Sequence, residues 1–208
     1  MPNRAIRVLV VDDHPVVREG VVAIIADQPD MVVTGEAGTG SAAIDHFRRD
    51  RPDVVLMDLQ MPDMNGLDAI AEIVREFPEA RIVVLTTYSG DAMALRALRA
   101  GAVGYLLKNT LRKEMVDAVR SVYNGGKHLN AEVATGIAFG AARDDLSDRE
   151  RGVLQYAASG NSNKQIAAHL FMSEETVKGH MKAIFLKLGA SDRTHAVTIA
   201  AKRGIIEL

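Results

Sequence analysis

The chain contains no cysteine. It can therefore form neither a disulfide framework nor a thiolate metal site, and redox chemistry at cysteine is excluded. A cysteine-free composition suits the reducing cytosol, so we expect a cytoplasmic protein.

Long hydrophobic runs are missing near the N-terminus. Arg4 and Arg7 precede the first apolar run, Val8–Val11, which is far too short for a signal-peptide core and is followed by two aspartates. We expect no secretion signal and no association with a membrane. The hydrophobic content of 48% over 208 residues is ample for the cores of two small domains.

The chain also has little net charge, −2 in total, but the charge is unevenly distributed. Residues 1–125 carry 14 Lys and Arg against 18 Asp and Glu, whereas residues 146–208 carry 9 against 6. An excess of this size is a weak indication that the C-terminal half contacts nucleic acid, because clustered charge matters more than the total.

Strand and helix patterns alternate through residues 1–125. Short continuous apolar runs are typical of buried parallel strands, and the strand candidates are Val8–Val11, Met31–Val33, Val54–Met57, Ile82–Leu85 and Tyr105–Leu107. The helical patterns between and after them are Val16–Ala26, Ala42–Arg49, Leu67–Glu76, Ala92–Ala100 and Leu111–Tyr123. This alternation predicts an α/β domain with a doubly wound, five-stranded parallel sheet.

A second, all-α domain is expected after a linker. Asn124-Gly125-Gly126 gives an end signal for the preceding helix, and residues 131–145 are rich in small residues. We therefore predict a first domain at 1–125, a linker at 126–145 and a second domain at 146–208. The second domain has four helix-sized apolar patterns and no β-rich run.

Three carboxylates follow two of the predicted strands. Asp12 and Asp13 end the first strand and Asp58 ends the third, so the topology would bring them to one edge of the sheet. Clustered carboxylates repel one another unless a cation holds them together. An all-oxygen site of this kind favours Mg²⁺, with Asp13 and Asp58 as the expected direct ligands.

A hydroxyl and an ammonium are predicted at the same edge. Thr86 follows the fourth strand and Lys108 the fifth. If Asp58 attacks a phosphoryl group, Mg²⁺ and Lys108 would neutralise its oxygens while Thr86 donates a hydrogen bond. The sequence thus predicts a phosphoryl-transfer pocket.

The residues at these strand ends resemble the receiver domain of two-component response regulators. The matching segments are Val10–His14, Leu56–Pro62, Leu85–Thr87 and Gly104–Lys108. The resemblance covers about residues 5–125 and implies a flavodoxin-like fold in which Asp58 accepts phosphate from a sensor histidine kinase.

The same resemblance implies further roles. Asp12, Asp13 and the backbone carbonyl of Gln60 would help to place Mg²⁺, while Thr86 and Tyr105 would relay the phosphorylation signal. On this hypothesis Tyr105 fills space that Thr86 vacates as it moves inward. Bulk at Gln60 and Tyr88 would also hinder the water that hydrolyses the acyl phosphate, which predicts slow dephosphorylation.

Two other interpretations use the same residues. An Asp-nucleophile phosphohydrolase would use the same sheet, Mg²⁺ and lysine, but such enzymes usually have a second acid at the position of Gln60. The other alternative is a DNA-binding protein independent of phosphorylation, or a pure protein-interaction module that keeps only the receiver fold, and the complete pocket argues against both. Taken singly, each of these polar residues could instead start a helix or carry surface charge.

The C-terminal segment contains a helix-turn-helix pattern. Ser147 and Glu150 are spaced as a capping box that opens a helix. Asn163–Leu170, a short turn and a helix capped by Ser173 then follow with helix-turn-helix spacing. The second of these helices directs Val177, Met181, Ile184 and Leu188 to one face.

A basic face remains on that second helix. Thr176, Lys178 and Lys182 point away from the apolar face, with Gly179 between the lysines. A recognition helix places such side chains in the major groove, where lysine reaches guanine or phosphate. Glycine inside a helix costs about 0.8–1 kcal/mol relative to alanine, so Gly179 implies either a packing constraint or a close approach to DNA.

Residues 146–206 resemble the LuxR-type output domain. The segments that carry this resemblance are Leu146–Glu150, Ser162–Ala167 and Ser173–His180. Together with the receiver pattern they indicate the NarL/FixJ family. The resemblance implies that phosphorylation promotes homodimerisation and DNA binding, with RNA polymerase as a further partner. The DNA-contact candidates are Asn163, Lys164, Thr176, Lys178, Gly179 and Lys182.

Overall fold

The computed structural model describes residues 4–87, 90–110, 112–129, 131, 133–135 and 146–206. These residues belong to two compact units, the first built mainly from residues 4–87 and 94–129 and the second containing residues 146–206. Among the described residues, no helix is both long enough and apolar enough to cross a membrane.

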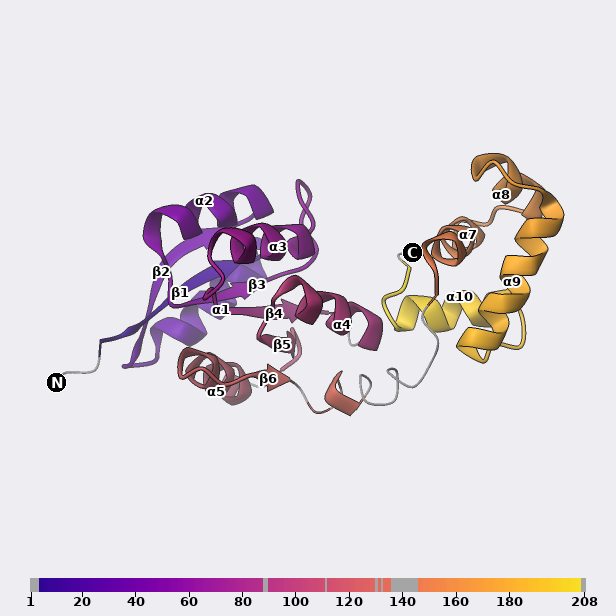
Figure 1. Cartoon of the computed structure of the whole chain (residues 1–208). Coiled ribbons are helices and arrows are strands. Elements are labelled where there is room, and N and C mark those ends of the chain that lie inside the picture. The colour runs from indigo at the N-terminus through magenta and orange to yellow at the C-terminus, as the bar shows by residue number, and fades with distance from the viewer. Residues whose placement is uncertain are drawn as a thin grey trace. The chain divides into compact units, whose positions relative to one another are not determined.

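The first unit is built on a parallel sheet with the strand order β2-β1-β3-β4-β5-β6 (Figure 1). Its strands are β1 (Ile6–Val11), β2 (Met31–Ala37), β3 (Val54–Met57), β4 (Ile82–Thr86), β5 (Gly104–Leu107) and β6 (His128–Leu129). The predicted parallel α/β fold is confirmed, but the predicted count of five strands is wrong. The sixth strand was missed because two residues are too short to form a recognisable apolar run.

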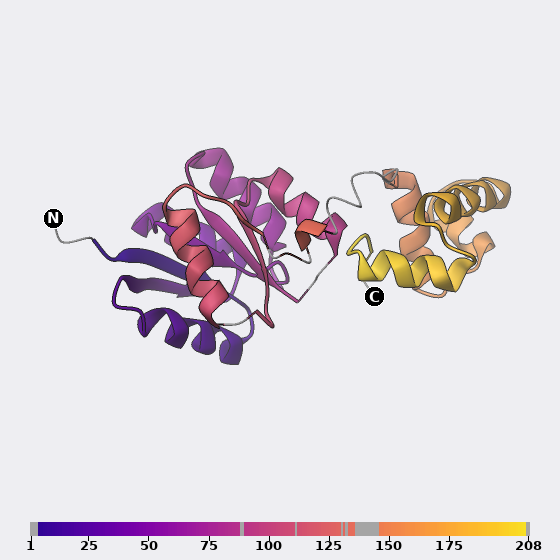
Figure 2. The ribbon, with the colours of Figure 1, turned by 90° about the horizontal axis from the view of Figure 1, so that it is seen from below.

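In the part of the chain that the structure describes, five helices cover the two faces of this sheet. They are α1 (Pro15–Ala26), α2 (Gly40–Asp50), α3 (Gly66–Glu76), α4 (Asp91–Ala100) and α5 (Arg112–Tyr123). Helices α1 and α5 pack on one face, where Val21 and Val119 meet Val10 and Leu56 in a single apolar core. Helices α2, α3 and α4 lie on the other face (Figures 1 and 2). Alternate residues of each buried strand therefore face opposite helical layers.

The described residues of the second unit form helices joined by short turns, with no strand among them. Its helices are α7 (Asp148–Ala158), α8 (Asn163–His169), α9 (Glu174–Leu188) and α10 (Arg193–Lys202). The predicted capping box is present, because the Ser147 hydroxyl accepts from the Glu150 backbone and Glu150 accepts from the Ser147 backbone. Ser173 caps α9 as predicted.

The apolar stripe of α9 builds the core of this second unit. Val177, Met181, Ile184 and Leu188 are all buried, as the helical spacing predicted. They pack with Val153 and the other buried residues of α7, α8 and α10 in one apolar cluster. Burying this stripe leaves the opposite side of α9 to solvent.

Candidate functional site

An acidic and basic cluster forms at the carboxyl edge of the first unit's sheet. The Lys108 ammonium, which follows β5, lies 2.7 Å from Asp12 Oδ2 and 2.8 Å from Asp58 Oδ2. Asp12 follows β1 and Asp58 follows β3, so residues nearly one hundred positions apart converge because parallel strands end at the same edge. The cluster predicted from the strand ends is therefore assembled.

Burial and charge act in opposite directions on this cluster. Asp12 and Asp58 are each only 2% exposed. Burial raises the pKa of the Asp58 carboxyl, although the hydrogen bond and the charge of Lys108 oppose the shift. Burial disfavours the charged form of Lys108, but its contacts with Asp12 and Asp58 outweigh burial and raise the lysine's pKa. The ammonium thus holds together two carboxylates that would otherwise repel.

Asp13 and His14 complete a set of possible metal ligands. One ligand atom from each of Asp12, Asp13, His14 and Asp58 lies within 4.8 Å of the others. Asp12 Oδ2 and Asp13 Oδ1 are buried, and they lie close to the Lys108 ammonium and to His14 Nδ1 respectively. A carboxylate oxygen has more than one lone pair and can also bind a hard cation, so this set of oxygen donors fits Mg²⁺.

The loop after Asp58 is held closely against that residue. The Leu59 backbone donates to Asp58 Oδ1 at 2.7 Å, and the Gly66 backbone donates to the Leu59 carbonyl at 2.9 Å. A Cβ atom on Gly66 would lie only 2.2 Å from the Asp58 carbonyl oxygen. Glycine is therefore required at position 66 for the loop to fold back onto the cluster.

An aspartate anchors the same loop to a neighbouring helix. Asp63 accepts from the backbones of Gly40 and Ser41, at 3.0 and 3.1 Å, and so caps the start of α2. Hydrogen bonds from Ser41 and its neighbours lower the pKa of the Asp63 carboxyl to about 2. The carboxylate therefore stays ionised and keeps the loop attached across the physiological range.

Thr86 and Tyr105 lie inside the fold near the cluster. Both are fully buried, and the Thr86 carbonyl accepts from the Lys108 backbone at 2.7 Å. Tyr105 occupies an interior position in this structure. Gln60 is exposed after β3, and Tyr88 lies outside the described residues.

The second unit carries a separate group of polar residues on α8 and α9. Thr176, Lys178, Gly179 and Lys182 are exposed on α9, while Lys164 is exposed on α8. The Thr176 hydroxyl lies 2.8 Å from the Ser173 hydroxyl. The predicted basic face therefore exists.

The two lysines of that face differ in their surroundings. Lys178 lies 3.7 Å from Glu174 and 3.6 Å from Glu175, whereas no carboxylate pairs with Lys182 in the part of the chain that the structure describes. A Cβ atom on Gly179 would meet nothing within 4 Å. Packing thus gives no reason for glycine at this position.

Two arginines beside these groups had no signal in the sequence. Arg18, one turn into α1, donates to the Asp12 carbonyl at 2.7 Å. Arg193, at the start of α10, donates to Asn163 Oδ1 at 3.1 Å. Each partner lies on another element, so only knowledge of the tertiary packing could have identified these contacts.

Comparison with known families assigns both units. Residues 8–120 match the response regulator receiver domain, and residues 144–200 match the bacterial regulatory proteins of the luxR family. The chain belongs to the NarL/LuxR-type response regulators. The family consists of two-component transcriptional regulators with a helix-turn-helix output domain rather than turnover enzymes, which sets aside the phosphohydrolase interpretation.

Relatives match this response regulator over nearly its whole length. A Bacillus subtilis transcriptional regulatory protein, YxjL, is 41% identical over 100% of both chains. The Mycobacterium tuberculosis DNA-binding transcriptional activator DevR/DosR is 36% identical over 95% of this chain and 94% of its own.

A solved structure is similar to nearly the whole chain. RcsB from Salmonella enterica serovar Typhimurium, bound to a promoter in the presence of the phosphomimetic BeF3⁻, is similar with 26% identity and a TM-score of 0.75. The match covers 96% of this chain and 99% of that chain.

Proposed function

We propose that Asp58 is the phosphoacceptor of this response regulator and that a partner sensor histidine kinase supplies the phosphoryl group. The observation that carries the proposal is the position of the Asp58 carboxylate, which is buried beside Asp12 and 2.8 Å from the Lys108 ammonium. A carboxylate oxygen of Asp58 would bond to phosphorus as the bond from phosphorus to the kinase histidine breaks.

Three side-chain groups and one backbone group would hold Mg²⁺ in this pocket. They are the carboxylates of Asp12, Asp13 and Asp58 and the backbone carbonyl of Gln60. The clustering of the three carboxylates, with one ligand atom of each within 4.8 Å of the others, supports this assignment. When bound, the ion supplies positive charge against the phosphoryl oxygens and the clustered acids.

Lys108 and Thr86 have complementary roles in the proposed transfer. The ammonium of Lys108 already sits between two carboxylates and would move its contact to a phosphoryl oxygen, which carries more charge. The hydroxyl of Thr86 would donate to another phosphoryl oxygen. Thr86 and Tyr105, both buried, would pass the resulting change to the surface around β4 and β5 as a population shift.

The helix-turn-helix unit would bind DNA through the exposed side of α9. Lys178 and Lys182 would contact bases or phosphates in the major groove, with Thr176 and Gly179 beside them. Asn163 and Lys164 would contact the flanking DNA backbone. DevR/DosR is described as a DNA-binding activator, and RcsB has been solved on promoter DNA, which supports this role.

Phosphorylation would promote a homodimer that reads two half-sites. A dimer places its recognition helices about 10–10.5 base pairs apart, or a multiple of that spacing. RNA polymerase is the further partner that transcriptional regulation in the cytoplasm would require. We assign residues 1–125 to the receiver, 126–145 to the linker and 146–208 to the DNA-binding domain; β6 then lies at the start of the linker.

Intact-protein mass spectrometry tests the phosphoacceptor. The protein is incubated with Mg²⁺ and acetyl phosphate, and we expect a phosphate-sized mass gain in the wild type and none in Asp58→Asn. Asp53→Asn is the matched control, because Asp53 lies just before β3, at the strand's opposite end, and accepts from the Arg7 backbone. A gain that persists in Asp58→Asn would disprove the assignment.

A further inference from the structure

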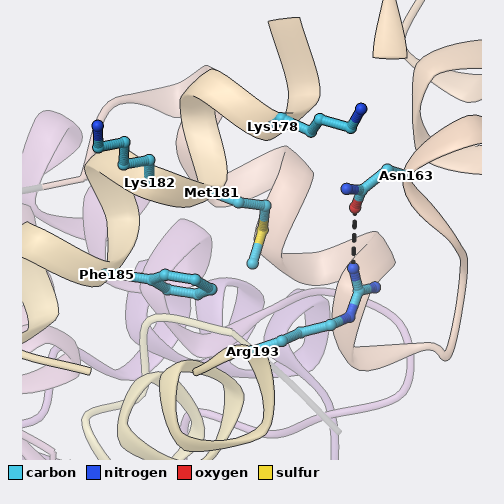
Figure 3. Close-up of a pocket in the computed structure, with 6 residues that line it drawn as sticks. All are labelled: Asn163, Lys178, Met181, Lys182, Phe185 and Arg193. Atoms are coloured by element: carbon cyan, nitrogen blue, oxygen red, sulfur yellow. Dashed lines mark hydrogen bonds between the residues drawn. The ribbon is translucent and has the colours of Figure 1, made fainter. Parts of the chain in front are cut away.

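A pocket of about 340 Å³ lies beside the recognition helix α9 within the helix-turn-helix unit. Side chains from α8, α9 and α10 line it (Figure 3), and they are Asn163, Lys178, Met181, Lys182, Phe185 and Arg193. Three of the six are cationic and none is acidic. Lys178 has two glutamates beside it, but Lys182 and Arg193 have no carboxylate partner among the described residues, so the pocket attracts anions.

Arg193 is fixed in this pocket by neutral oxygens alone. Its guanidinium donates to Asn163 Oδ1, to the Ala157 carbonyl at 3.2 Å and to the Asn161 carbonyl. No carboxylate pairs with Arg193 within the described ranges of the chain. These hydrogen bonds hold the guanidinium in place without neutralising its charge. Its positive charge therefore remains available to an anion that enters the pocket.

The same contact orients the amide of Asn163. A guanidinium can only donate hydrogen bonds, so the atom of Asn163 that faces Arg193 must be its carbonyl oxygen. Figure 3 shows this oxygen turned toward Arg193. The amide nitrogen is consequently left to donate to a ligand.

The remaining wall of the pocket is apolar. Met181 and Phe185 lie on successive turns of α9 between the two lysines and Arg193 (Figure 3). A cationic and amide-lined edge beside an aromatic and thioether wall matches a phosphodiester joined to a deoxyribose, because the sugar presents carbon atoms next to the charged phosphate.

We propose that this pocket binds a backbone phosphate of one DNA strand while the exposed side of α9 enters the adjacent major groove. The proposal rests on the DNA-binding role of α9; it adds Arg193 and Phe185 to the DNA contacts and gives Asn163 a defined partner, the bound phosphate. Contacts to phosphate position a protein on the duplex without distinguishing its sequence. The pocket therefore contributes equally to binding at all sites.

Three variants that each lower the net charge by one test the pocket. Arg193→Gln removes the cation, and Asn163→Asp keeps an acceptor for Arg193 but neutralises its charge. Lys202→Gln is the matched control, because Lys202 is exposed near the end of α10 and does not line the pocket. Thermal unfolding of each variant shows whether its fold is retained.

DNA affinity is measured against salt concentration on two duplexes of equal length. One duplex is selected by the wild type from a random pool, and the other is unselected. We expect both pocket variants to lose about fivefold in affinity at 0.15 M salt, on both duplexes, with a salt slope smaller by about 0.9. Lys202→Gln should change neither quantity.

The outcomes separate this proposal from the one on which it rests. If the wild type binds neither duplex, DNA binding itself fails. If the wild type binds but Asn163→Asp keeps the wild-type salt slope, or loses affinity on the selected duplex alone, the phosphate assignment is overturned. Asn163→Asp decides the matter even if Arg193→Gln does not fold, because it preserves the hydrogen bond to Arg193.

Discussion

The two functional regions of this response regulator are built in opposite ways. The proposed phosphoacceptor pocket collects Asp12, Asp58 and Lys108 from three strand ends and buries both carboxylates. The proposed DNA-binding face takes Lys178 and Lys182 from adjacent turns of one helix and leaves them exposed. The pocket depends on the assembly of the whole sheet, whereas the lysine face depends only on the regular spacing of residues along one helix.

This difference determines how each region should respond to mutation. In the pocket, backbone loops pack against charged groups, so a single added carbon atom displaces a functional residue. On the exposed face a side chain can change without disturbing the fold. Substitutions in the pocket should therefore alter stability and function together, and substitutions on α9 should separate them.

The largest effect is expected from Gly66→Ala. The new Cβ atom would lie 2.2 Å from the Asp58 carbonyl oxygen and 2.7 Å from Leu59 Cα, so the loop must shift. We expect a loss of about 3 kcal/mol in unfolding free energy, as for severe overpacking, with slower phosphorylation. Urea denaturation and the rate of mass gain with acetyl phosphate measure the two effects.

Gly20→Ala is the control for this change. Gly20 lies in α1, and a Cβ atom there would meet nothing within 4 Å. It should stabilise the protein by up to about 1 kcal/mol, because alanine favours helix. Equal effects of the two substitutions would contradict the close packing of the loop.

Glu150→Gln tests whether the second unit contains a comparable buried charge. Burial opposes its ionisation, yet hydrogen bonds from Lys187, at 2.9 Å, and Ser147 lower the pKa of Glu150. The stabilisation is therefore complete above the ordinary pKa of about 4.3 and is lost as pH falls through the lowered value. We expect the variant to lose about 2 kcal/mol at pH 7 and progressively less toward pH 3.

Hydrogen exchange of the α7 and α9 amides in the full chain measures this loss. Glu175→Gln is the control, since Glu175 is 86% exposed in its side chain and its pair with Lys178 should contribute little. A constant difference between wild type and Glu150→Gln across this pH range would count against the ionised pair.

Gly179→Ala should separate stability from DNA recognition. Since no atom lies within 4 Å of the position that the added methyl group would take, we expect α9 to gain about 1 kcal/mol. The methyl group would nevertheless stand between Lys178 and Lys182 and alter base preference at one operator position. Selection from a random duplex pool, combined with thermal unfolding, measures both effects.

Gly152→Ala provides the matched comparison. Its Cβ atom would make ordinary contact with Leu170 at 3.8 Å, and α7 does not carry the candidate DNA contacts. It should give a similar gain in stability with unchanged base preference. If Gly179→Ala also leaves base preference unchanged, Gly179 has no part in recognition.

The smallest effect is expected at Phe171, in the turn between α8 and α9. Its φ is +54° and the residue is 97% exposed. The free-energy cost of its left-handed backbone is therefore not offset by burial of the ring. Phe171→Gly should stabilise the protein by less than about 1 kcal/mol. Phe171→Ala keeps the cost of the left-handed backbone and should not stabilise the protein. Thermal unfolding of both variants measures the difference.

Much of the fold followed from pattern alone. Continuous apolar runs predicted the parallel sheet, and the spacing of Val177, Met181, Ile184 and Leu188 predicted the buried stripe of α9. The capping residues Ser147 and Ser173 were also predicted correctly. These features depend on neighbours within a few residues, so the sequence carries them directly. The two-residue β6 was missed because it pairs only through β5.

The sequence by itself determined which chemical groups are present and at which strand ends or helix faces they stand. Only the tertiary structure decided that Lys108 bridges Asp12 and Asp58, that Gly66 must lack a side chain and that Arg193 is held beside Asn163. Each of these contacts joins residues between 8 and 96 positions apart. Such contacts depend on how elements pack, and local patterns of hydrophobicity and charge do not encode that packing.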